Sequence, residues 1–276
     1  MEVGELAALV VEIAGRATCP FDHTEKPLTK RTNDFPPAGG DNNATTLGQK
    51  MGKAHFDDLV EGEMPDGTKI AVQHTPHHLI PGDESWPETK LRKWVDKKFN
   101  HIKENIGYDV NEAYNGCTLP GVAGSKKKMD GSSNGVSSWE AHPNQMGYAH
   151  GAMKSTNYNR QFHDRHVTYS DFVINMLDKI SEALDSKVEN GESPGCGKTD
   201  CAGDITKKKK FDPPINLMNR LEAVAGRLEG KLVGNYRTWK IPLITSAWVL
   251  TLKAAIDLEE AKKKIADAGE IIRGAR

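Results

Sequence analysis

The sequence predicts an α+β protein that is mostly helical. Apolar residues recur at helical spacing over 170–187 and 215–232. A short β-prone run, 69–73, leads into the adjacent pair His77-His78, and a second short strand is expected in the run 115–120, which ends at a proline. Long helices together with short strands favour the α+β class.

The composition excludes any global attraction to nucleic acid. The 276 residues carry 37 lysines and arginines against 38 acids, a net charge of −1, with 37% hydrophobic residues and a mean hydropathy of −0.60. This length suits one large domain or two ordinary ones with a core of normal size. Binding to a polyanion must therefore come from a local patch of charge.

The N-terminal segment 1–15 is expected to be an amphipathic helix that ends at Gly15. It carries three glutamates where a secretory signal peptide would carry basic residues, so no Sec-type leader is expected. The longest apolar stretch, 241–256, contains Lys253 and several small or hydroxyl residues. It is better explained as a helix buried in protein than as a membrane span, so no membrane partner is expected.

Three of the four cysteines lie in loops with a nearby ligand-type residue. Cys19 and His23 form a Cys-x3-His pair, and Cys196 and Cys201 form a Cys-x4-Cys pair. Such short spacings suit a tetrahedral structural zinc, which would join segment 1–68 to the loop 196–201 and make 1–200 one folding unit. The alternatives are a Cys196–Cys201 disulfide, or isolated thiols with His23 exposed. The fourth cysteine, Cys117, is expected to be a small buried residue.

The segment before the histidine pair is charged and turn-rich, with Asp66-Gly67 as a hairpin turn. Pro76 and Pro81-Gly82 bracket the pair, so the chain is expected to bend there. One histidine can then hold a metal ion while the other takes a proton from water. The alternative is a solvated pair in a turn.

The helices that follow are expected at 84–106, from Ser155 onward, and at 170–187. The aromatic stripe of 84–106 is interpreted as packing on the core rather than as a base-stacking platform. Between them, 121–138 is rich in Gly, Ser and Lys and is expected to be an exposed loop.

A local basic patch lies between Leu119 and His166, with six lysines or arginines against three acids, a local charge of +3. The side chains expected to contact phosphate or DNA are Lys126, Lys127, Lys128, Lys154, Tyr158 and Arg160. Of the other histidines, His74 and His142 are expected in loops, where either could contact phosphate. His163 and His166 are expected on a helix, where an i, i+3 pair can bind metal but more often faces water.

The best boundary is Pro213-Pro214, just after the lysine run 207–210. Beyond it, 215–232 and 242–272 are expected to be helices that support the rest or offer a surface to a partner. The division expected from the sequence is an N-terminal helix and loop-rich segment at 1–68, a core at 69–190 that contains the histidine pair, and a helical region at 211–276.

His77-His78-Leu79-Ile80-Pro81, then Asn115-Gly116 followed by Leu119-Pro120, then a histidine and a tyrosine ahead of a helix, resembles the AHH group of the His-Me finger (HNH-like) nucleases. The resemblance covers roughly 69–166. It implies a ββα-metal finger, in which a β-hairpin and a helix hold one divalent cation of the Mg or Zn class.

By that resemblance His78 is the general base, His77 a metal ligand, and Asn115 the residue that braces the loop holding the base. His150 would be the second protein ligand. The chain departs from the family where Pro76 stands in place of alanine, and where Lys154 and Ser155 stand ahead of Tyr158 in place of a second histidine.

Nucleases of this group are frequent as toxin domains of bacterial polymorphic and type VI secretion systems. The resemblance therefore implies a metal-dependent, non-specific DNase that is secreted without a classical signal peptide, acts in the cytoplasm of a competing bacterium, and has a cognate immunity protein. RNA is the other substrate to consider. The alternatives are a housekeeping or phage HNH endonuclease, and a zinc-stabilised binding module without catalysis.

Overall fold

The computed structural model describes residues 43–52, 58–191, 210–214, 216–258 and 262. Within them the protein is a mixed α+β structure with one small sheet, as the sequence predicts. The residues expected to hold a structural zinc, Cys19, His23, Cys196 and Cys201, lie outside the described residues, so that site stays a prediction. Cys117 is a buried free thiol, as expected.

Two compact units make up the chain. The first consists of residues 1–54, 76–117 and 167–230, and the second of residues 55–75, 118–166 and 231–276. Each unit is therefore assembled from segments far apart in the sequence. The sequence-based division into 1–68, 69–190 and 211–276 follows chain order and stays a prediction.

The sheet has the strand order β1-β2-β3, with β1 at Leu59–Glu63, β2 at Lys69–His78 and β3 at Gly116–Gly121. Strands β1 and β2 form an antiparallel hairpin in which Leu59 pairs with Gln73. Gly67 closes the turn with φ +85°, a conformation that glycine adopts without strain. The expected Asp66-Gly67 hairpin is confirmed.

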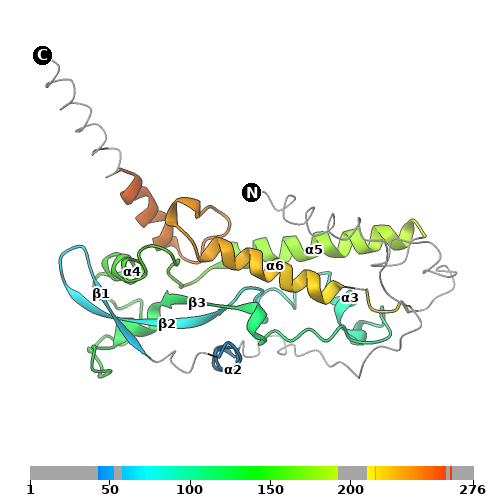
Figure 1. Ribbon diagram of the computed structural model, residues 1–276, viewed down its shortest axis with the longest axis horizontal. Coiled ribbons are helices and arrows are strands. Elements are labelled where there is room, and N and C mark those ends of the chain that lie inside the picture. Colours follow the sequence, from blue (N-terminus) through cyan, green and yellow to red (C-terminus); the bar gives the residue numbers. More distant parts are fainter. Residues whose placement is uncertain (1–42, 53–57, 192–209, 215, 259–261, 263–276) are drawn as a thin grey trace, which may run out of the picture. The chain divides into compact units, whose positions relative to one another are not determined.

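In the second unit, helix α4 (Gln145–Lys154) packs against β1 (Figure 1). The Asn144 side chain begins the helix by accepting a hydrogen bond from the Gly147 N–H at 2.8 Å. Gly151 faces the hairpin so closely that a Cβ there would lie 2.9 Å from the Glu63 carbonyl oxygen. A glycine at this position lets the helix approach the strand backbone.

The core of the second unit is aromatic. Trp139, Tyr148, Phe162 and Trp239 lie in one buried cluster, together with Val249 from a helix at 247–258. The sequence placed the start of that helix at 242, but residues 241–246 form turns. The Ser246 hydroxyl accepts the Trp248 N–H at 3.2 Å, which places the cap, and so the helix start, after the turns.

In the first unit, the two long helices are α5 (Val167–Glu189) and α6 (Leu217–Leu232), which confirms the helices predicted at 170–187 and 215–232. Asp185 of α5 accepts hydrogen bonds from Lys93 at 2.7 Å and from the indole of Trp94 at 3.1 Å. These bonds join α5 to the short helix α3 (Arg92–Val95).

The single helix expected over 84–106 is wrong. The structure has only α3 and a 3-10 turn at Lys97–Phe99 in this segment. Asp96 is extended and its carboxylate accepts the Lys98 N–H, a local bond that competes with helix continuation. The apolar spacing nevertheless marked buried side chains, because Trp86, Trp94 and Ile102 are all in the core.

The helix expected from Ser155 onward is also wrong, since α4 ends at Lys154. Asn157 and Tyr158 have φ of 53° and 55°, and this left-handed backbone stops the helix. His163 and His166 consequently lie in an irregular segment before α5 rather than on a helix. Among the described helices, none combines the length and the apolar character that crossing a bilayer requires.

Candidate functional site

His78 is the last residue of β2 and is 6% exposed. Its Nε2 lies 2.9 Å from Asn111 Oδ1. Because an amide oxygen only accepts, Nε2 carries the proton and Nδ1 is the basic nitrogen of the neutral ring. Burial lowers the pKa of His78, against opposing effects of the Asn111 hydrogen bond and of the carboxylates of Asp83 and Asp109. The ring is therefore neutral, and able to accept a proton, at neutral pH.

Asn115 is fully buried and joins the segment after His78 to the segment that carries Asn111. Its Oδ1 accepts the Ile80 N–H at 2.8 Å, and its Nδ2 donates to the carbonyls of Ile80 at 3.0 Å and Val110 at 2.8 Å. The Asn115 carbonyl also accepts the Leu79 N–H at 2.8 Å. These contacts hold the backbone just after His78 and just before Asn111, as expected of a residue that braces the pair.

Asn111 is itself held in place by a second layer of contacts. Its N–H donates to Asp109 Oδ1 at 2.8 Å, and Asp109 forms an ion pair with Lys50. Lys50 closes α2 (Ala44–Lys50) and also pairs with Glu112 at 2.7 Å. A continuous series of bonds thus runs from α2 through Asp109 and Asn111 to the ring of His78.

His77 precedes His78 on the strand, so its side chain leaves the opposite face. It is 3% exposed, and its ring centroid lies 5.4 Å from that of Tyr169. Tyr169 is fully buried near the start of α5, and its hydroxyl donates to the Leu79 carbonyl at 2.5 Å. The two histidines therefore have separate surroundings. The expected bend begins only after His78, because both histidines belong to the regular strand.

In the second unit, His163 and His166 lie together, with ring centroids 5.1 Å apart. The His163 N–H donates to the Pro120 carbonyl at 2.8 Å, which attaches this segment to the end of β3. Both rings are partly exposed.

His150, the second ligand implied by the resemblance, lies on α4 with its Nε2 2.8 Å from the Tyr158 hydroxyl. Burial, and then the charge of Lys154, lowers its pKa. The structure thus brings together His150 and Tyr158, two residues singled out from the sequence, and it pairs them with each other. The role of His150 as a ligand stays a prediction.

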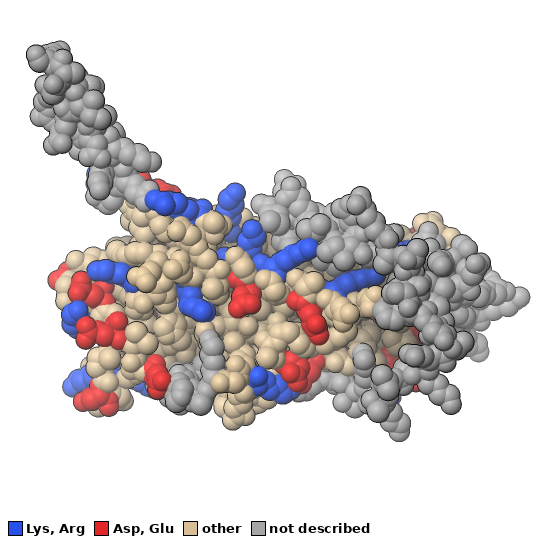
Figure 2. Space-filling model, in the orientation of Figure 1, with Lys and Arg blue, Asp and Glu red and all other residues tan. Residues whose placement is uncertain are grey.

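The basic patch is partly neutralised. Lys154 pairs with Glu63 at 3.1 Å, and Arg160 donates to Thr118 Oγ1 at 2.9 Å. Figure 2 shows basic and acidic side chains interspersed on the face it presents. The lysine run 126–128 forms no ion pair with an acid of the described residues, although Lys128 interacts electrostatically with Asp130 and Lys126 with Glu140.

A family of nucleases of the HNH/ENDO VII superfamily, defined by a conserved AHH motif, matches residues 60–193. These residues belong to the AHH nuclease family. The match contains His77, His78, Asn115, His163 and His166. No curated protein and no solved structure matches the chain. The AHH domain is accordingly a metal-dependent endonuclease, a hydrolase of phosphodiester bonds.

The AHH domain must therefore accommodate a divalent cation. Within the second unit, His163 and His166, with ring centroids 5.1 Å apart, could supply two imidazole ligands for one. Imidazole nitrogens suit a transition-metal ion such as Zn²⁺, and a site with few protein ligands leaves coordination positions for water and a phosphate oxygen. This donor set fits a catalytic ion better than a closed structural site.

Sequence reasoning missed Asn111 and Tyr169 as site residues, and it favoured a water-facing position for the pair His163 and His166 over a role as metal ligands. The histidines and Tyr169 carry a weak signal, since they recur every three residues just before and within the start of α5. For Asn111 the sequence holds no such signal, because its contact with His78 joins residues 33 positions apart.

We expect that Asn111→Ala lowers the cleavage rate at least about tenfold with KM near the wild-type value, because the His78 ring loses the partner that fixes its tautomer. Asn111→Asp should instead raise the pKa of His78, since a carboxylate favours the imidazolium. The base works only when neutral, so the rise of the single-turnover rate with pH moves to higher pH in this variant. If both variants showed the pH profile of the wild type, the positioning role of Asn111 would be refuted.

Proposed function

We propose that the AHH domain hydrolyses double-stranded DNA without sequence preference, and that the chain is a toxin effector delivered into competing bacteria. One observation supports the chemistry most strongly. His78 is buried and neutral, and Asn111 directs its proton to Nε2, which leaves Nδ1 to act as a base. A residue prepared in this way suits the activation of water at neutral pH.

In this mechanism His78 takes a proton from the attacking water, and Asn115 keeps the strand end that carries His78 in place. His77 would be a ligand of the cation. When bound, a divalent ion neutralises charge on the phosphate oxygens and stabilises the leaving 3′ oxygen. The finer assignment of a ββα-metal finger is part of this proposal, as is the choice between Mg- and Zn-class ions.

The proposed indifference to sequence follows from the kind of contacts available. The second unit carries the lysine run 126–128, which forms no ion pair with a described acid and suits contacts to phosphates, and such contacts carry no information about bases. DNA binding should therefore weaken steeply with salt.

The toxin role rests on the resemblance to domains of polymorphic and type VI secretion systems. It requires a cognate immunity protein that protects the producing cell. That partner would be acidic where it covers the active site, or would bind neighbouring helices and block access. A secretion-system component would be a further partner.

A plasmid assay tests the enzymatic part. We expect wild-type protein with Mg²⁺ or Zn²⁺ to convert supercoiled plasmid to linear DNA and then to a smear, and excess EDTA to stop the reaction. Discrete bands at a reproducible sequence would contradict non-specificity and favour a housekeeping or phage endonuclease. Intact plasmid and intact RNA with every metal would favour a zinc-stabilised binding module.

Expression in a bacterial cytoplasm tests the toxin part. We expect wild-type protein to arrest growth and His78→Ala, at an equal protein level, to leave growth normal. Harmless expression of protein that cleaves plasmid in vitro would contradict the toxin role and leave the nuclease intact.

A further inference from the structure

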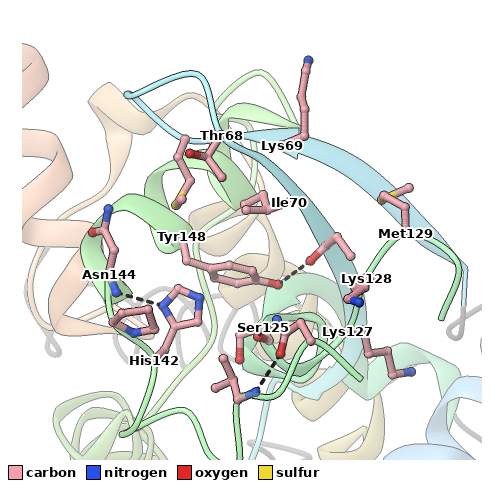
Figure 3. Close-up of a pocket in the computed structure, with 15 residues that line it drawn as sticks. Thr68, Lys69, Ile70, Ser125, Lys127, Lys128, Met129, His142, Asn144 and Tyr148 are labelled. Carbon is pink, nitrogen blue, oxygen red and sulfur yellow. Dashed lines mark hydrogen bonds between the residues drawn. The ribbon is translucent and has the colours of Figure 1, made fainter. Parts of the chain in front are cut away.

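A pocket of about 330 Å³ opens in the second unit. Figure 3 shows its wall between β2, which carries Lys69 and Ile70, the loop with Lys127 and Lys128, and the start of α4. This volume lies at the lower end of small-molecule pockets. It is large enough for a single planar group with a short polar extension.

The inner wall is apolar and fixed in place. The Tyr148 ring is almost fully buried, its hydroxyl donates to the Ala71 carbonyl at 2.8 Å, and Ile70 and Val136 line the pocket beside it. Around Tyr148, Gly124 packs so closely that a Cβ there would lie 2.6 Å from the Tyr148 hydroxyl. A flat apolar ligand would meet a preformed surface here.

His142 adds one polar group to this wall. Its Nδ1 accepts the Asn144 N–H at 3.2 Å, and its ring packs edge-on against Tyr148 with centroids 5.2 Å apart. Burial lowers the pKa of His142, opposed by the hydrogen bond from Asn144, so the ring is neutral and its Nε2 carries a proton. The pocket thus offers a hydrogen-bond donor beside an apolar surface.

The lysines at the mouth of the pocket belong to an ordered loop. Lys127 pairs with Ser133 as an antiparallel bridge, and the Lys128 N–H donates to the Ser132 carbonyl at 2.8 Å. Gly131, with φ +82°, closes the turn. The loop therefore presents two adjacent cations at set positions.

The charge at the mouth is positive. Neither Lys127 nor Lys128 forms an ion pair with a described acid, whereas Lys69 is compensated by Glu61 at 2.9 Å and Glu63 at 3.0 Å. No aspartate or glutamate is among the described residues that line the pocket. An anion at the mouth would consequently meet two cations, with Asp130 of the same loop, whose carboxylate interacts with Lys128, as the nearby acid.

We propose that this pocket binds one unpaired or terminal nucleotide of the substrate strand. The base lies on the wall formed by Tyr148 and Ile70, and the phosphate lies at Lys127 and Lys128. The assignment rests on the proposed function, because it takes the substrate to be a nucleic acid. A nucleotide combines the planar, weakly polar body and the anionic group that this pocket matches, and a base enters it only when displaced from the duplex or at a strand end.

Binding should be measured with the full chain carrying His78→Ala, so that the probes are not cleaved. The probes are deoxyadenosine 5′-monophosphate, a labelled single-stranded oligonucleotide, a duplex with a single-stranded overhang, and a blunt duplex. We expect the overhang duplex to bind more tightly than the blunt duplex, and the free nucleotide to shift NMR signals of the pocket residues.

Two variants test the two halves of the pocket. Val136→Trp fills the apolar part and should weaken overhang binding about tenfold, within the range of base–aromatic stacking, while blunt-duplex binding stays unchanged. Lys127→Glu with Lys128→Glu should weaken every strand probe and lower the salt slope by about one per lysine. The matched control replaces Lys97 and Lys98 with glutamate. These two exposed lysines are consecutive in the sequence and belong to the first unit, so this variant should keep the overhang preference.

Equal binding of overhang and blunt duplexes by His78→Ala, with no change in Val136→Trp, would overturn the pocket assignment. So would a control pair that weakens overhang binding as much as the pocket pair. These results leave plasmid cleavage by the wild type untouched, so the pocket can fail while the nuclease stands. Wild-type protein that cleaves no nucleic acid would instead refute the proposed function.

Discussion

His78→Ala is expected to reduce the rate of DNA cleavage by at least about a hundredfold, the usual scale for a lost general base. The substitution removes the ring whose proton Asn111 directs to Nε2, which leaves Nδ1 as the base. Burial also lowers the pKa of this ring. Single-turnover cleavage of plasmid, with metal in excess, measures the effect. Thermal unfolding within a few degrees of the wild type would show that the fold remains.

The matched control is His74→Ala, which removes a half-buried histidine from the same strand. It should leave cleavage within a few-fold of the wild type, because this residue has no part in the proposed mechanism. Cleavage by His78→Ala at near-wild-type rate would remove the mechanism. Equal losses in both variants would instead indicate general damage to β2.

Asn115→Ala is expected to have the largest effect on stability. It leaves the Ile80 N–H and the carbonyls of Ile80 and Val110 buried without their partner. Each unsatisfied buried group costs about 1–3 kcal/mol, so the free energy of unfolding should fall by about 3 kcal/mol or more. Chemical denaturation measures this loss, and cleavage should fall with it because the strand end that holds His78 is released.

Asn134→Ala is the control for this variant. Asn134 also accepts a backbone N–H, from Val136 at 2.9 Å, and donates to the Ser125 carbonyl at 2.8 Å, but it is exposed. Water replaces its bonds, so the loss should stay below about 1 kcal/mol. Similar losses in the two variants would show that burial of Asn115 does not give it a special role.

Local pattern predicted the parts of this protein whose structure is decided locally. The Asp66-Gly67 turn fixed the hairpin, and the apolar period of 170–187 predicted α5. The same reasoning failed where a side chain competes with the helix, as Asp96 does within 84–106, and where Asn157 and Tyr158 take a left-handed backbone.

The site was only half visible in the sequence for a related reason. The adjacent histidines at a strand end and the nearby Asn-Gly were local signals. The partner that orients His78 was not, because Asn111 approaches it only once the segment after β2 has folded onto the segment before β3, with Asn115 between them. Contacts of this kind depend on tertiary packing and leave no period or spacing to find.

The central claim is that two neighbouring histidines do different work, His77 holding the metal and His78 moving the proton. Calorimetric titration of Mn²⁺ into metal-free His77→Ala and His78→Ala tests it most directly, since the thiolate site predicted at Cys19, Cys196 and Cys201 would bind Mn²⁺ poorly. The account predicts wild-type Mn²⁺ affinity with lost cleavage for His78→Ala, and affinity at least about tenfold weaker for His77→Ala. Weakened affinity in His78→Ala together with wild-type affinity in His77→Ala would contradict it.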